Sequence, residues 1–230
     1  MKNKIKVEAV KTCYHYMEHY WIIDGKPIVE YLDNYMKAGL CPALSRFGSM
    51  LGLLPAWNGR LIWNWENDFI WELIDGQMNG YEEINLPILV CEDDCDLSCI
   101  IILAKVRKSE NCVYWDKIGY LNRKNWDIRE EQKSGILCLA AYTEKDWEFY
   151  GDNIALEEYN SAEYWDWVSK NSYEENIRRL RNYMKPYMQK EENIDWIKET
   201  RWQFDIYEYK AAVNVYRKLY IENRKPYITE

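Results

Sequence analysis

The sequence has few histidines, no long apolar run and no common nucleophile or nucleotide motif. Its 230 residues include only two histidines, and the patterns G-x-S-x-G, G-x-x-x-x-G-K and G-x-G-x-x-G do not occur. No window approaches the roughly eighteen uncharged apolar residues of a membrane span. The first thirteen residues, MKNKIKVEAVKTC, lack the apolar core of a signal peptide. We therefore expect a cytoplasmic protein with no membrane partner and no cofactor.

Cysteine and net charge exclude further classes of protein. Seven cysteines are an odd number and far too few for a disulfide scaffold, which favours free thiols in a reducing compartment. A content of 48% apolar and 30% charged residues predicts a folded chain, which we interpret as one domain over residues 1–230. The formal charge of -8 argues against nucleic acid or anionic lipid as a partner.

The middle of the chain has the pattern of a β-sheet. Residues 86–91, 99–108 and 112–121 are runs of β-branched or aromatic side chains separated by short turn-like stretches. Short connections between consecutive strands favour antiparallel pairing. Residues 134–142 could add a fourth strand. We predict the α+β class, with a central antiparallel sheet, helices packed against it and a mainly helical carboxy-terminal part.

Helices are expected both before and after this sheet in the sequence. Asp24-Gly25 predicts a turn after a short strand, and Pro27 then suits the first turn of a helix. Capping-box spacings predict two later helix starts, and Pro186 should end or kink the second of these helices. A strand over 200–210 and a helix over 211–224 complete the prediction. The two capping boxes are Thr143 with Asp146 and Ser172 with Glu175.

Lysine and arginine are absent from residues 61–104, which carry ten acidic residues. The rest of the chain is nearly balanced, with 30 basic and 28 acidic residues. Two exposed carboxylates about 6 Å apart repel by roughly 0.7 kcal/mol in water, so the segment should cost a few kcal/mol unless basic side chains fold over it. Aromatic residues lie between the acids, a pattern typical of a surface for a basic protein partner. The aromatics are Trp63, Trp65, Phe69, Trp71 and Tyr81.

We predict that this segment forms a partner-binding surface and that the chain has no catalytic residue and no metal ligand. Two other interpretations stay open: the acids form solvated faces or pair internally with basic residues of 176–190, or the EDDCD stretch of 92–96 holds a divalent cation. That stretch lacks the calcium-loop pattern. The predicted partner-binding residues are Glu66, Asp68, Trp71, Glu72, Asp75, Tyr81, Glu82, Glu83, Glu92, Asp93, Asp94 and Asp96.

Two further patterns bear on metal binding. His15, Glu18 and His19 match H-x-x-E-H, and on a helix both histidines would share one face and could bind zinc. The flanking residues differ from that protease family, so a metal-dependent hydrolase is kept as an alternative function. The cysteines at 91, 95 and 99 are spaced by four rather than in C-x-x-C knuckles, so we interpret them as small buried residues.

The chain as a whole resembles bacterial immunity proteins of polymorphic-toxin and contact-dependent-inhibition systems. The resemblance lies in its size, acidity and richness in tryptophan and tyrosine, and in the segments WIIDGKPIVEYL, LPILVCEDD, VYWDKIG and WEFYGDNIA. It implies a cytoplasmic, non-catalytic protein that binds one cognate toxin domain, often a basic nuclease, through a carboxylate-rich face. A carbohydrate-binding module built on the aromatics is a further alternative, and the oligomeric state stays open.

Overall fold

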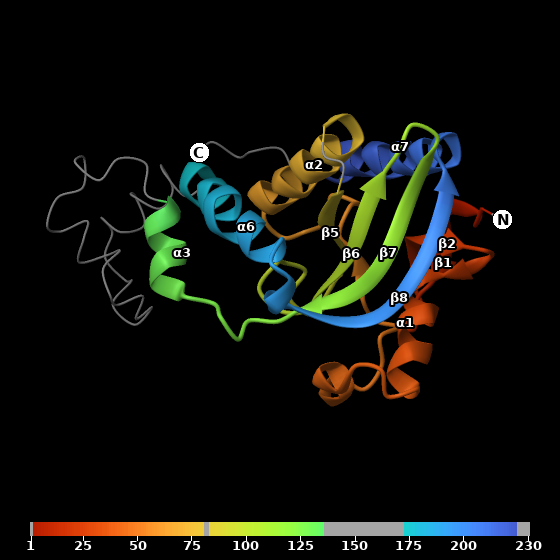
Figure 1. Ribbon diagram of the computed structural model, residues 1–230, viewed down its shortest axis with the longest axis horizontal. Helices are drawn as coiled ribbons and strands as arrows, with labels where there is room; N and C mark the ends of the chain where they lie inside the picture. Colours follow the sequence, from red (N-terminus) through yellow and green to blue (C-terminus); the bar gives the residue numbers. More distant parts are fainter. Residues whose placement is uncertain (1, 81–82, 136–172, 225–230) are drawn as a thin grey trace, which may run out of the picture. The chain divides into compact units, whose positions relative to one another are not determined.

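The computed structural model describes residues 2–80, 83–135 and 173–224. Contacts divide the chain into two compact units, Met1–Asn122 with Glu191–Glu230 and, between them in sequence, Arg123–Lys190. The first unit contains both β-sheets (Figure 1). None of the described helices is both long and apolar enough to cross a membrane.

A small antiparallel sheet opens the first unit, in the order β1-β2-β3. Its second connection is the predicted turn: Asp24 and Gly25 have φ values of 49° and 84°, as a two-residue hairpin turn requires. Pro27, with φ of -59°, precedes helix α1, which confirms the predicted strand, turn and helix. The earlier hairpin partner β1 was not predicted. The elements are β1 Ile5–Lys11, β2 Met17–Ile23, β3 Lys26–Pro27, α1 Ile28–Lys37 and the 3-10 helix η1 Pro42–Phe47.

A five-stranded antiparallel sheet in the order β4-β5-β6-β7-β8 forms the centre of the first unit. Three of its strands fall on the predicted runs, so the predicted α+β class with a central antiparallel sheet is confirmed. The predicted carboxy-terminal strand is longer than expected and begins earlier, after the 3-10 helix η5 Glu191–Asn193. The strands are β4 Leu54–Pro55, β5 Glu83–Val90, β6 Ile101–Lys108, β7 Cys112–Leu121 and β8 Ile194–Asp205.

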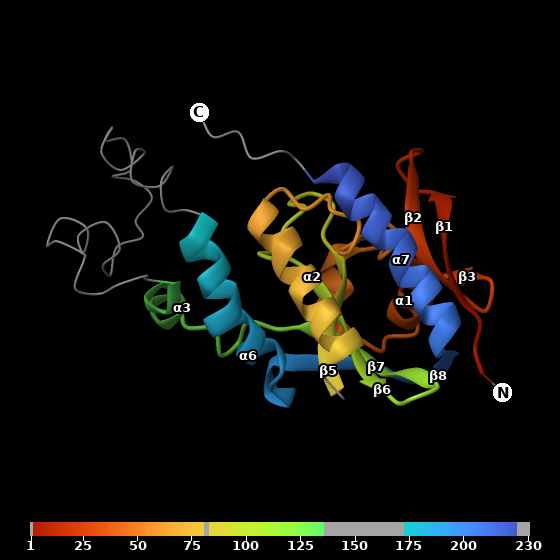
Figure 2. The same cartoon turned by 90° about the horizontal axis from the view of Figure 1, so that it is seen from above.

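Two helices, α2 Asn64–Asn79 and α7 Ile206–Asn223, lie side by side over this sheet (Figure 2). Helix α7 begins at Ile206, where the Asp205 side chain accepts a hydrogen bond from the Tyr207 N–H and caps the helix. The predicted strand therefore stops at Asp205 and not at Lys210. Helix α2 was not predicted, although it carries four of the ten acids of segment 61–104.

An aromatic cluster joins the two sheets and α7 in the core. The Trp21 ring of β2 lies 4.9 Å from the Trp57 ring, 5.4 Å from the Trp115 ring of β7 and 4.9 Å from the Tyr216 ring of α7, measured between ring centroids. It also stacks on Tyr209 at 5.8 Å. All five residues are fully buried. Much of the high tryptophan and tyrosine content therefore serves packing.

The second unit is helical where it is described. It contains α3 Ile128–Gly135, an α-helical stretch over 173–179, the π-helical turn η4 Leu180–Met184 and α6 Lys185–Met188. Pro186 was predicted to end or kink the second of the capping-box helices. The helix does not end there but continues to Met188, and its regular α-helical hydrogen bonding is interrupted by the π-helical turn Leu180–Met184 just before the proline, which has no N–H to donate. The predicted strand over 134–142 lies outside the described residues from 136 on, as do Thr143, Asp146 and Ser172 of the predicted capping boxes.

Candidate functional site

The acids of segment 61–104 divide among three places in the first unit. Eight residues of β5, roughly 26 Å of extended chain, separate the acid at its start from the turn that follows it. The segment therefore does not form the single patch that its charge pattern predicts. Helix α2 carries Glu66, Asp68, Glu72 and Asp75, β5 begins at Glu83, the β5–β6 connection carries Glu92, Asp93, Asp94 and Asp96, and Tyr81 and Glu82 lie outside the described residues.

Basic residues from outside segment 61–104 pair with three of the acids of α2 and β5. Asp75 forms an ion pair with Arg217 of α7, and Asp68 accepts hydrogen bonds from Arg224 at 2.6 Å and from the Tyr220 hydroxyl at 2.5 Å. Glu83 pairs with Lys105 of β6 at 3.1 Å (Nζ to Oε1). These pairs supply counter-charges that the segment itself lacks.

Trp71 and Glu66, two of the predicted contact residues, are buried in the fold. Trp71 is 3% exposed; its ring lies 5.3 Å from the Tyr220 ring, and the Arg217 guanidinium lies 4.3 Å from its centroid. Glu66 is 7% exposed and its Oε1 accepts a hydrogen bond from the Leu97 N–H at 3.1 Å. Neither residue can contact a partner without rearrangement. Glu66 instead fastens the β5–β6 connection to the start of α2.

The remaining acids form a compact turn of residues 92–96, called here the acidic turn. It is held in place by backbone bonds: the Cys95 N–H donates to the Cys91 carbonyl at 3.1 Å, and the Ile62 N–H donates to the Cys95 carbonyl at 2.8 Å. Cys95 has φ of 49°, in the left-handed region. Asp96 accepts hydrogen bonds from both the N–H and the hydroxyl of Ser98, at 2.7 and 2.6 Å. Asp93 and Asp94 are thus exposed on an ordered backbone, whereas Glu92 and Asp96 are half-buried.

Glu92 joins the acidic turn to the β1–β2 hairpin. Its Oε1 accepts a hydrogen bond from the Tyr16 hydroxyl at 2.5 Å. Burial and this bond to a carboxylate both raise the pKa of Tyr16 above its ordinary value. The negative charge of Glu92 also raises the pKa of Tyr14, the exposed residue two positions earlier. The hairpin tip thus lies within electrostatic range of the turn.

Exposed apolar side chains surround the acidic turn. Trp63 is 45% exposed and its ring stacks on that of Trp65, with centroids 4.7 Å apart and planes 10° apart. The neighbouring Ile62, whose backbone is bonded to the turn, is 48% exposed, and Tyr14 is 58% exposed. These four residues and the acidic turn are called here the acidic–aromatic face. The sequence pattern had indicated Trp63 and Trp65 as aromatics of a binding surface. It did not indicate Tyr14 and Ile62, which the fold brings close to the acidic turn.

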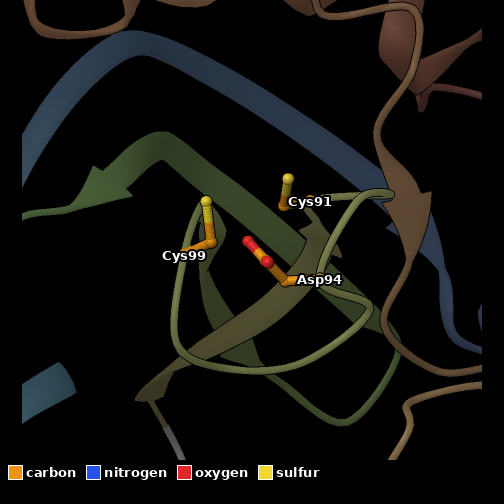
Figure 3. Close-up of side chains that lie close together, drawn as sticks. All are labelled: Cys91, Asp94 and Cys99. Atoms are coloured by element: carbon orange, nitrogen blue, oxygen red, sulfur yellow. The ribbon is translucent and has the colours of Figure 1, made fainter.

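Cys91 and Cys99 flank the acidic turn, and the Asp94 side chain points toward the cysteines (Figure 3). One donor atom from each of these three residues lies within 4.8 Å of the other two. Burial, followed by hydrogen bonds to Asp94 and Cys91, raises the pKa of the Cys99 thiol to about 12. The middle cysteine of the sequence trio faces elsewhere, because the Cys95 thiol donates to the Glu92 carbonyl at 2.8 Å. Of the three cysteines predicted to be buried, Cys91 is buried, whereas Cys95 and Cys99 are partly exposed.

The histidine motif does not form the helical arrangement that its zinc chemistry requires. His15 lies in the β1–β2 turn with φ of 72°, and His19 lies in strand β2. The Glu18 carboxylate between them is buried; it accepts a hydrogen bond from the His19 N–H at 2.7 Å and pairs with Arg60 at 3.0 Å. Both carboxylate oxygens of Glu18 are engaged, and the motif is not helical. These residues therefore do not present the shared helix face on which two histidines bind one metal.

Comparison with known proteins identifies no relative of this chain. No protein-family model matches it, and neither curated proteins nor solved structures give a significant match. The acidic–aromatic face is therefore assigned from geometry, burial and charge alone.

Proposed function

We propose that this protein is a non-catalytic inhibitor that binds a basic protein through the acidic–aromatic face, in the manner of a bacterial toxin-immunity protein. The observation that carries this proposal is the exposed Trp63, stacked on Trp65 beside an ordered turn of four carboxylates. Stacking fixes the ring in one position, so little side-chain freedom remains to be lost when a partner covers it.

Charge at the acidic turn supports a basic partner. Among the described residues, Glu92, Asp93, Asp94 and Asp96 form no ion pair with a lysine or arginine, in contrast to Asp68, Asp75 and Glu83. The nearby cation Arg60 is paired with the buried Glu18. Uncompensated carboxylates steer a positively charged protein toward this surface, and their effect falls with salt.

The aromatic residues supply what carboxylates lack. Rim charges change association rates more than affinity, whereas buried tryptophan and tyrosine side chains dominate binding energy. Ile62, Trp63 and Tyr14 expose apolar surface next to the acidic turn, so one partner surface can contact both groups. A carboxylate-rich surface with aromatic anchors can mimic a polyanion and cover the active site of a basic nuclease. This is the arrangement that the resemblance to immunity proteins implies.

The proposal expects the neighbouring gene to encode a toxin domain, and the test is neutralisation of that domain. Co-expression with that domain in a sensitive bacterium should restore growth, and the purified pair should form a one-to-one complex. Asp93→Lys should slow association and flatten its dependence on salt. The matched control is Glu110→Lys, which makes the same charge change at the exposed β6–β7 turn, at the opposite end of β6.

Two outcomes would contradict the proposal. The first is that growth is not restored although both proteins are folded and present. The second is that Asp93→Lys and Glu110→Lys slow association equally, because net charge and not the acidic–aromatic face would then govern the encounter.

A further inference from the structure

We propose that Cys91, Asp94 and Cys99 form a binding site for a zinc-class divalent cation. Two thiols and a carboxylate come together from the two ends and the middle of the β5–β6 connection, with the Asp94 side chain directed toward that of Cys99 (Figure 3). This inference does not depend on the proposed function, because it rests on donor type and geometry and not on an interaction with a protein.

The distances between the donor atoms suit a tetrahedral ion. Zinc–sulfur bonds of about 2.3 Å place two thiolates of a tetrahedral site about 3.8 Å apart. The three donors already lie within 4.8 Å of one another. Closure around an ion thus needs side-chain movements of about 1 Å or less, and the backbone can remain where it is.

The backbone that carries the donors is well supported. Cys91 follows the last residue of β5, and its N–H donates to the carbonyl of Ile100, the residue before β6, at 3.1 Å. The sheet pairing therefore holds the two cysteine positions together at the neck of the hairpin. Asp94 comes from the acidic turn. The N–H of Ile62, two residues before α2, donates to the Cys95 carbonyl of this turn, and Glu66 of α2 accepts from the N–H of Leu97, the residue after it. Donors on rigid elements favour a metal site because little order has to be gained on binding.

Donor chemistry selects the class of ion. Thiolates favour zinc and similar ions over magnesium and calcium, which prefer sites made entirely of oxygen. Two thiolates and one carboxylate carry three negative charges, so a divalent ion leaves the site with one negative charge. Since Asp94 is exposed, the fourth coordination position faces solvent and is filled by water in the isolated protein. The two thiols lose their protons when they bind the ion, so binding exchanges two protons for one divalent ion and leaves the net charge of the turn unchanged.

Cobalt titration of the reduced full-length protein tests the site. Co²⁺ bound by two thiolates in a tetrahedral site gives a thiolate charge-transfer band in the near ultraviolet and d–d bands in the visible region. We expect one Co²⁺ per chain, displaced by one Zn²⁺. Cys91→Ser and Cys99→Ser should each abolish the two-thiolate spectrum, and Asp94→Asn should weaken binding by at least about 10-fold.

Two matched variants from the same turn serve as controls. Cys95→Ser removes a thiol that faces away from the site, and Asp93→Asn removes a neighbouring carboxylate; both should leave the spectrum and the stoichiometry unchanged. The inference is overturned if the reduced wild-type protein shows no thiolate band at equimolar Co²⁺, which requires no variant to fold. It is also overturned if the band survives in both cysteine variants, or if Cys95→Ser removes it as completely as Cys99→Ser.

Discussion

Gly59 is the position where the loop before the acidic–aromatic face comes closest to α7. Its φ is +77°, and a Cβ atom at this position would lie 2.7 Å from the Tyr220 Cα and 2.9 Å from the Tyr220 carbonyl oxygen. Ordinary non-bonded contacts are about 3.5–4.0 Å, and both obstructing atoms belong to a helix backbone. The Asn223 side chain also donates to the Asn58 carbonyl at 2.8 Å, so this contact anchors the loop that leads to Trp63.

Gly59→Ala should therefore destabilise the protein through two separate effects. Left-handed backbone costs a residue with a Cβ about 1–2 kcal/mol, and forcing the loop away from α7 adds about 1–3 kcal/mol, as for other overpacked sites. Gly39→Ala is the matched control, because Gly39 has φ of +73° but nothing within 4 Å of an added Cβ. It should show only the first, smaller cost.

Urea unfolding followed by tryptophan fluorescence measures the difference between the two variants. With m values of about 1–3 kcal/mol per molar urea, an additional 2 kcal/mol shifts the midpoint by roughly 1 M. Equal losses in Gly59→Ala and Gly39→Ala would refute the reasoning, because the close approach of the loop to α7 would then carry no energetic weight.

Three further predictions concern stability. Trp21→Ala, which empties the centre of the buried aromatic cluster, should cost about 3–5 kcal/mol in the same urea assay. Arg217→Ala should cost no more than about 1 kcal/mol by thermal unfolding, since the side chains of Arg217 and Asp75 are 37% and 47% exposed. Burial acts to raise the pKa of Asp33, but hydrogen bonds, chiefly from Lys37, lower it overall. Asp33 therefore stabilises the protein above its ordinary pKa of about 3.9, and this contribution is lost as the pH falls through the folded pKa. The stability advantage of the wild type over Asp33→Asn, measured by urea unfolding between pH 7 and pH 3, should shrink with acidity.

Much of the central sheet could be predicted from local sequence. Residues 112–121 were predicted as a strand and form β7, because β-branched and aromatic side chains between short turns favour strands. Helix α2 escaped prediction because it is buried on more than one side. Besides Phe69 and Ile74 it buries polar residues such as Asn67 and Gln77, so no single apolar face marks it in the sequence.

The candidate site was only partly predictable, because its electrostatics depend on pairing across the chain. Arg217 lies 142 residues from Asp75, and Arg224 lies 156 residues from Asp68. A count of charges along the sequence registers the excess of acid in one segment but not the cations that fold onto it. Cys99 lies close to Cys91 because the strands that flank the connection pair as a hairpin. The spacing rules for metal ligands along a sequence do not describe such a contact.

The binding role of the acidic–aromatic face is tested most directly by the dissociation constant of the Trp63→Ala variant for the proposed toxin partner, measured by calorimetry. A tryptophan anchor predicts a loss of at least about 2 kcal/mol, roughly 30-fold in affinity. The matched control is Tyr207→Ala, which removes an aromatic side chain that is 76% exposed at the start of α7, away from the acidic turn. This control should bind like the wild type. Wild-type affinity in Trp63→Ala, or an equal loss in both variants, would contradict the assignment of this face.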